Sequence, residues 1–287
     1  MRPNVLKEAM HQLRTITTTQ LLFSSPPAIL RQPPPSQFYS HHHHHQRSMA
    51  TMSSNDSNLD AIFEQKRLLR SKVRKQLKAM NTTQRSQQDA AIQNSVLESS
   101  WFKSSERLCA YVSCSALREV DTSKILSDIL CDQEKEGGGL IRKKLYVPRV
   151  EDKNSYMRML NISTTEDLIA NSMNILEPSP VDCDGNQRQD VMDSNTPVDL
   201  ILLPGLAFDR SGRRLGRSGG YYDMFLKRYQ ELSMERKWKL PLLVALAYDL
   251  QILDDGAIPV APHDIPVDAL VSPTGVIPIT PAAKERM

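Results

Sequence analysis

The chain has 287 residues, 40% of them hydrophobic and 24% charged, a composition typical of a globular protein with one large domain or two small ones. No apolar run approaches the ~20 residues that a membrane-spanning helix needs, so we expect no membrane partner. The net charge of +3 is uneven, because residues 1–48 hold five basic residues and one acidic residue, which leaves −1 for the remainder. General nucleic-acid binding requires clustered positive charge, so nucleic acid is not an expected partner.

Residues 1–50 form a leader that is nearly free of acid and contains Arg, Ser, Thr and Pro. This composition is typical of an organellar transit peptide. We predict a mitochondrial location; a plastid location, or a cytoplasmic form begun at Met49 or Met52, are the alternatives. The five histidines at 41–45 are predicted to be a low-complexity run or a purification tag rather than a metal site.

Residues 59–80 have the apolar spacing of an amphipathic helix. The apolar positions are Ile62, Leu69, Val73, Leu77 and Met80. Lys66 falls inside this apolar stripe and Arg70 lies beside it. A lysine on the buried face of a helix either extends its ammonium group to solvent or pairs with an anion. The spacing does not distinguish these alternatives.

The next segments alternate between helix and strand. Asn81 and Gln84 predict a helix cap, residues 108–113 and 145–150 predict strands, and residues 157–160 predict an edge strand. Glu119 follows the first of these strands and precedes a helix. Ligands bind at the carboxyl ends of strands in α/β proteins, although the dipole of the following helix also favours an exposed acid there.

Residues 199–226 are the most informative stretch. An apolar strand ends at Pro204, a loop follows, and helical spacing begins at Tyr221. The loop contains Gly212, Gly216, Gly219 and Gly220, together with Arg213, Arg214 and Arg217. Backbone N–H groups in such a loop, a helix N-terminus and arginines make a phosphate site. A basic surface loop between a strand and a helix is the alternative.

The last motif follows another apolar strand at residues 242–248. His263, Asp264 and Asp268 stand in the pattern H-D-x-x-x-D, and His263 is the one histidine beyond the leader. Imidazole beside a carboxylate indicates a metal or proton-transfer site, and a surface histidine in a proline-rich loop accounts for it equally well.

Alternating strands and helices from residue 108 to 271 favour a three-layer α/β/α domain with a mainly parallel sheet. We expect this domain over residues 51–272, with an exposed insertion loop at 179–197 and a C-terminal tail at 273–287. The four cysteines show no C-x-x-C spacing, which indicates ordinary thiols and no metal cluster.

The combined motifs resemble the 5-formyltetrahydrofolate cyclo-ligase family, also called 5,10-methenyltetrahydrofolate synthetases, over roughly residues 59–270. The motifs are K-R-x-x-R at 66–70, E-V-D-T at 119–122, P-G-L-A-F-D at 204–209, R-L-G-R at 214–217, G-Y-Y-D at 220–223 and H-D-x-x-x-D at 263–268. The resemblance implies the Rossmann-like sheet of sugar-phosphate isomerases and CoA transferases. Ser218-Gly219 departs from the G-G and G-K forms of the family loop, a difference that bears on substrate affinity.

The resemblance also implies a reaction, in which ATP phosphorylates the formyl oxygen of 5-formyltetrahydrofolate and N10 closes the ring to give 5,10-methenyltetrahydrofolate, ADP and phosphate. The implied ATP-binding residues are Lys66, Arg67, Arg70, Arg214, Leu215, Gly216, Arg217, Ser218, Gly219, Gly220, Tyr221 and Tyr222. The implied folate-binding residues are Cys114, Glu119, Arg217, Ser218, Gly219, Gly220 and Tyr221. Arg217 and Tyr222 are the implied catalytic residues, and Asp223 and Asp264 the implied Mg²⁺ ligands.

We therefore expect a monomeric enzyme that acts on small molecules. Another ATP-dependent kinase or ligase on the same fold would keep the phosphate loop and lose the roles of Glu119 and Tyr221. A non-catalytic nucleic-acid module would use the basic helix at residues 66–78, but the charge of the body and the lack of interleaved exposed aromatics oppose it.

Overall fold

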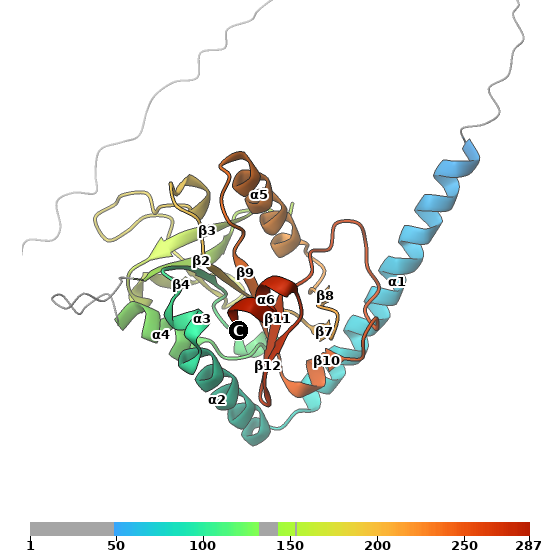
Figure 1. Ribbon diagram of the computed structural model, residues 1–287, viewed down its shortest axis with the longest axis horizontal. Coiled ribbons are helices and arrows are strands. Elements are labelled where there is room, and N and C mark those ends of the chain that lie inside the picture. Colours follow the sequence, from blue (N-terminus) through green and yellow to red (C-terminus); the bar gives the residue numbers. More distant parts are fainter. Residues whose placement is uncertain (1–48, 132–142, 153) are drawn as a thin grey trace, which may run out of the picture. The chain divides into compact units, whose positions relative to one another are not determined.

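A seven-stranded sheet in the order β12-β11-β9-β6-β1-β2-β3 organises the fold (Figure 1). The computed structural model describes residues 49–131, 143–152 and 154–287, and one compact unit spans Ser48–Met287. The leader with its histidine run lies outside the described residues. In the part of the chain that is described, no helix is long and apolar enough to cross a membrane.

The strands of this sheet are β1 (Arg107–Ala110), β2 (Lys144–Val150), β3 (Met157–Ile162), β6 (Leu200–Leu203), β9 (Leu242–Leu246), β11 (Ala269–Ser272) and β12 (Gly275–Pro278). The five inner strands run parallel, whereas the edge strands β3 and β12 are antiparallel to their neighbours. This confirms an α/β protein with a mainly parallel sheet. Strand β9 lies inside the sheet with all five residues buried, as its unbroken apolar run predicts.

Helices cover both faces of the sheet. They are α1 (Met49–Ala79), α2 (Thr82–Glu98), α3 (Ser100–Lys103), α4 (Ser123–Cys131), α5 (Tyr221–Glu235) and α6 (Pro281–Arg286). Successive strand residues point to opposite faces, so Leu108 of β1 joins the apolar cluster of Ile92 from α2, while Cys109 joins that of Phe225 from α5. The predicted cap of α2 is confirmed, since the side chain of Asn81 accepts a hydrogen bond from the Gln84 amide at 2.8 Å.

A small second sheet interrupts the predicted loop between β6 and α5. It contains β7 (Ala207–Asp209), β8 (Arg214–Leu215) and β10 (Ile252–Leu253). Asp209 is fully buried, and its Oδ1 accepts hydrogen bonds from the amides of Ser211 and Arg213 at 3.1 and 3.0 Å. An aspartate that bonds the backbone two residues on is a turn former, so the conspicuous Phe208-Asp209 pair stabilises this β-hairpin.

The expected C-terminal tail is instead part of the sheet. Strand β12 pairs with β11 over four residues, and Ala283 of α6 is fully buried. The side chain of Asp268 accepts a hydrogen bond from the Thr280 hydroxyl at 2.7 Å and from the Leu243 amide at 2.8 Å. The prediction was wrong because the Pro- and Thr-rich sequence hides an antiparallel edge strand that the partly buried carboxylate of Asp268 fixes in place.

The expected insertion loop at 179–197 is continuously exposed only at 183–187, and its second half contains buried residues among exposed ones. Residues 183–187 are exposed around the turn at Gly185, whereas Asp190 and Val191 are buried. The side chain of Asp190 accepts a hydrogen bond from Arg158 Nε at 2.7 Å and caps the 3-10 turn η3 (Val191–Asp193). This contact with β3 is the reason that the second half is fixed on the body.

Two glycines have similar positive φ angles but differ in the space around them, so they allow the cost of backbone strain to be measured apart from the cost of a steric clash. Gly212 has φ +86° and a Cβ there would lie 2.6 Å from the Val267 carbonyl oxygen, while Gly185 has φ +82° with open space around it. We expect Gly185→Ala to cost about 1–2 kcal/mol through its positive φ, and Gly212→Ala to cost about 1–3 kcal/mol more through overpacking. Urea unfolding of both variants measures this difference, and equal losses would contradict the role of the Val267 contact.

Candidate active site

The cavity that holds most of the predicted site residues lies at the carboxyl ends of β1, β2 and β6. Its volume is about 290 Å³, and it is lined by residues that follow β1, such as Tyr111 and Cys114, and that follow β6, such as Pro204 and Gly205. The chain passes from β1 to β2 on one side and later returns to β6 on the other side. Ligands bind at such a reversal of strand order in open α/β sheets.

Two ion pairs with buried cations lie near one end of the cavity, which Arg214 and Asp223 line and Lys66 and Asp264 do not. Lys66 of α1 is 3% exposed and pairs with Asp264, whose Oδ2 also accepts a hydrogen bond from the Ala261 amide at 2.7 Å. Arg214 is 6% exposed and pairs with Asp223 Oδ1 at 2.8 Å. The sequence left open whether Lys66 reaches solvent or an anion, and in the structure it meets an anion.

Asp223 and Asp264 are brought together although 41 positions separate them in the sequence. Asp223 Oδ1 accepts a hydrogen bond from the amide of Ile265 at 3.3 Å, and Ile265 follows Asp264 directly. The two ion pairs together contain two cations and two carboxylates, so their formal charges sum to zero. We call these four residues the charge quartet: Lys66, Arg214, Asp223 and Asp264. A neutral group tolerates burial far better than an unpaired charge.

The glycine-rich loop at 216–220 is held by arginines of α1. Arg70 Nε donates to the carbonyl of Gly216 at 2.8 Å, and Arg74 donates to the carbonyl of Arg217 at 3.1 Å. Gly220 caps α5 with φ +67°, a left-handed conformation that favours glycine. Gly219 has no space for a side chain, because its Cβ would lie 2.5 Å from the Tyr221 ring. The loop therefore presents its backbone at the start of a helix, where anions bind.

Arg214 has spare hydrogen-bonding capacity at this place. Its Nε is buried and has no acceptor among the described residues, although the guanidinium also approaches the Pro204 carbonyl at 3.4 Å. The guanidinium carbon lies 5.8 Å from the centre of the Tyr222 ring. A buried donor without a partner is unfavourable unless a ligand supplies the acceptor.

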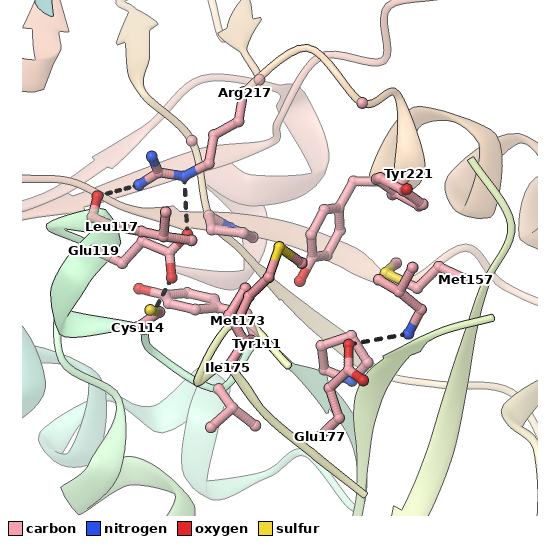
Figure 2. A pocket seen from close by; sticks show the side chains of 18 of the residues that line it. Tyr111, Cys114, Leu117, Glu119, Met157, Met173, Ile175, Glu177, Arg217 and Tyr221 are labelled. Carbon is pink, nitrogen blue, oxygen red and sulfur yellow. Dashed lines mark hydrogen bonds and ion pairs between the residues drawn. The ribbon is translucent and has the colours of Figure 1, made fainter. Parts of the chain in front are cut away.

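Glu119 lies on another wall of the cavity and is fully engaged (Figure 2). Its Oε1 accepts a hydrogen bond from Arg217 Nε at 3.1 Å, and its Oε2 accepts one from the Cys114 amide at 3.0 Å. Arg217 also donates to the carbonyl of Leu117. Burial raises the pKa of the Glu119 carboxyl, and the Arg217 charge and the Cys114 amide oppose this shift without cancelling it.

The two tyrosines at the start of α5 both line the cavity. Burial raises the pKa of the Tyr222 hydroxyl, the Glu119 charge raises it further, and Arg214 lowers it in part. Tyr222 therefore remains protonated at neutral pH and is a hydrogen-bond donor. Tyr221 donates from its hydroxyl to the Asp152 carbonyl at 3.2 Å, which fixes its ring beside the loop.

Six predicted site residues do not line the cavity: Lys66, Arg67, Arg70, Leu215, Ser218 and Asp264. Lys66, Arg70 and Asp264 lie behind its wall in the contacts given above, and the other three are directed elsewhere. Arg67 is exposed and forms two hydrogen bonds of 2.7 Å with Glu64 on the same helix. Leu215 is fully buried, because β8 pairs with β7 and turns its side chain into the core. Ser218 is exposed at φ +108°. His263 is also outside, stacked on Phe63 at 6.1 Å between ring centres.

The opposite end of the cavity was not predicted from the sequence. The hairpin of β4 (Leu168–Ala170) and β5 (Leu176–Pro178) contributes Met173, Ile175 and Glu177, and β3 contributes Met157. Figure 2 shows these side chains around the opening beside Tyr221. The positions of these residues in the sequence match no motif that indicates a site. Glu177, a glutamate among apolar residues, was the one feature that could have indicated it.

Together, a cavity at the reversal of strand order, buried cations and an exposed loop backbone are features of an α/β protein with a small-molecule site. The model of the 5-formyltetrahydrofolate cyclo-ligase family matches residues 62–273. The mitochondrial 5-formyltetrahydrofolate cyclo-ligase of Arabidopsis thaliana is 62% identical over 240 residues, which is 84% of this chain and 85% of the relative. The enzyme of Mus musculus is 32% identical over 212 residues, 72% of this chain and 92% of the relative.

A solved structure agrees with these relatives. The NMR structure of Aquifex aeolicus 5,10-methenyltetrahydrofolate synthetase has a TM-score of 0.57 and 28% identity, and the match covers 75% of this chain and 92% of that one. The chain belongs to the 5-formyltetrahydrofolate cyclo-ligase family, an ATP-dependent family that converts 5-formyltetrahydrofolate to 5,10-methenyltetrahydrofolate. The resemblance stated from the motifs is confirmed.

The raised pKa of Glu119 predicts how stability changes with pH. The folded protein holds this proton more tightly than the unfolded chain, so the stabilisation is complete at low pH and is lost as pH rises through the raised pKa. Relative to Glu119→Gln, the free energy of unfolding of the wild type should therefore fall from about pH 4 upward. Urea unfolding between pH 3.5 and 8 measures the difference, and a difference that rises with pH would contradict it.

Proposed function

We propose that the cavity binds MgATP at the charge quartet and the folate at the opposite, apolar end, and that phosphoryl transfer to the formyl oxygen activates ring closure by N10. Arg214 carries this proposal, because it lines the cavity and its buried Nε has no acceptor among the described residues. A phosphate oxygen supplies the missing acceptor in a charge-assisted hydrogen bond. The start of α5 and the loop backbone beside it favour the same kind of ligand.

Lys66, Arg70 and Arg214, together with the backbone of residues 216–220, are the proposed triphosphate ligands. Arg70 uses Nε to hold the loop, which leaves its terminal nitrogens for phosphate. The loop backbone contributes N–H groups and the N-terminal end of a helix dipole. Arg67 and Leu215 are not among the proposed triphosphate ligands, because Arg67 bonds Glu64 and the Leu215 side chain is buried in the core.

Asp223 and Asp264 are the proposed Mg²⁺ ligands, and their chemistry fits this ion. Carboxylate oxygens are hard ligands, and Mg²⁺ is commonly held by one or two carboxylates together with phosphates and water. When bound, Mg²⁺ would neutralise charge on the phosphates that react. Lys66 and Arg214 now neutralise these carboxylates, and both cations become available to the phosphates when the carboxylates hold a divalent ion.

Around the folate, Glu119, Cys114 and Tyr221 shape the proposed site, with Tyr222 and Arg217 beside the reacting atoms. The formyl oxygen attacks the γ-phosphorus and ADP leaves; N10 then attacks the activated formyl carbon and phosphate departs. Tyr222 remains protonated and donates a hydrogen bond, while Arg217 neutralises developing negative charge and holds Glu119 in place. Catalysis of this kind depends on positioning and charge neutralisation.

The fold, the leader and the assembly state complete the proposal. Helices on both faces of the sheet support a three-layer, Rossmann-like class like that of sugar-phosphate isomerases. Residues 1–50 act as a mitochondrial transit peptide, in keeping with their charge and with the mitochondrial relative from Arabidopsis thaliana. One chain supplies both ends of the cavity, so a monomer contains a complete site, and we propose that the enzyme acts as a monomer.

A direct assay tests the function and the metal ligands together. Purified protein with 5-formyltetrahydrofolate and MgATP should produce the absorbance of methenyltetrahydrofolate; wild-type binding of ATP without this product would overturn the function.

Asp223→Asn should lower turnover by about 100-fold or more and raise the Mg²⁺ concentration needed for half-maximal rate. Asp255→Asn, an exposed acid elsewhere, is the control. Unchanged Mg²⁺ dependence would contradict the metal assignment.

The leader is tested separately. A fusion of residues 1–50 to a fluorescent protein should accumulate in mitochondria, because the leader combines basic charge with very little acid. Replacing Arg2, Lys7 and Arg14 with Gln should abolish the import. Accumulation in plastids or in the cytoplasm would contradict the mitochondrial assignment.

A further inference from the structure

The cavity contains a second buried glutamate whose charge is unmatched. Glu177 on β5 is 8% exposed and lies at a different end of the cavity from Glu119 (Figure 2). Its Oε1 accepts a long hydrogen bond from the Val150 amide at 3.3 Å. Its other oxygen has no donor, and no cation pairs with this carboxylate, in the described ranges 49–131, 143–152 and 154–287.

The surroundings of Glu177 give its second oxygen no donor from the described residues, which leaves this oxygen to solvent or to a ligand. Met157, Met173 and Ile175 line the same part of the cavity, and a carboxylate in apolar surroundings requires hydrogen-bond donors or a countercharge. The arginines of the cavity are directed to other acids, Arg217 to Glu119 and Arg214 to Asp223. Glu119 differs because both of its oxygens already accept hydrogen bonds.

We propose that Glu177 recognises the amino-lactam edge of the pterin ring and thereby sets the orientation of the folate. This edge carries two neighbouring donors, the N3–H and the 2-amino group, which match the two oxygens of one carboxylate. The flat body of the ring then packs between the apolar side chains, where methionine adapts to ring surfaces. The inference rests on the proposed function, since it assigns one edge of that substrate to one residue.

This contact has a consequence for the reaction. With the pyrimidine edge held at Glu177, the saturated ring that carries the formyl group extends away from β5 toward the end where Arg214, Arg217 and Tyr222 lie. A glutamate that fixes one edge in this way discriminates against rings that lack the matching donors. Loss of a partner for a buried charged acceptor costs about 10- to 100-fold in affinity.

The test combines a variant with a substrate analogue. Glu177→Gln should raise the KM for 5-formyltetrahydrofolate by about 10- to 100-fold and leave the KM for MgATP unchanged. For the wild type, an analogue with hydrogen in place of the 2-amino group should lose a similar factor, and Glu177→Gln should distinguish the two compounds by less than about 3-fold. Glu166→Gln, which removes the same charge from an exposed site, is the control.

Each result decides a different point. An unchanged KM for the folate in a folded Glu177→Gln protein overturns the inference, as does equal discrimination between the compounds by variant and wild type. If the variant does not fold, the wild-type protein still tests the inference. An equal KM of the wild type for 5-formyltetrahydrofolate and for the analogue without the 2-amino group overturns it. Failure of the wild type to produce methenyltetrahydrofolate refutes the proposed function instead, so the two failures are distinguishable.

Discussion

The charge quartet is the constraint on which the rest of the site depends. Lys66 and Arg214 are almost fully buried, and removing the partner of a buried charge costs about 3–5 kcal/mol. Each cation must therefore meet its acid, which holds α1, β8, the start of α5 and the loop before β11 together.

The cavity combines two kinds of surface because two parts of the chain build it. Near the quartet, arginines of α1 hold the carbonyls of the glycine-rich loop, so backbone and charge are fixed in advance of binding. Near β5 the wall is methionine, isoleucine and one buried glutamate. A cyclo-ligase acts on a polyanionic nucleotide and on a heterocycle with polar edges, and the function proposed above assigns one to each surface.

The residues between these ends are linked by hydrogen bonds. Glu119 connects Arg217 to the Cys114 amide, and its own carbonyl accepts a hydrogen bond from Tyr248, which also bonds the buried Asp89. The wall after β1 is thereby tied to α2 and to the end of β9. A fully satisfied network of this kind stiffens its members, and it explains why the carboxyl ends of the strands position side chains so closely.

The sequence by itself determined the strands β1, β2, β3, β6 and β9, the helices α1, α2 and α5, and the family. These follow from local periodicity and from contiguous motifs such as G-Y-Y-D at 220–223. The sequence also marked Lys66 as a charge on an apolar face. Tertiary structure alone decided that Asp264 is its partner, that β12 completes the sheet, and that Met173 and Glu177 complete the cavity. Those outcomes depend on contacts between residues distant in the chain, and packing in three dimensions settles such contacts, whereas periodicity records only the face to which each residue belongs.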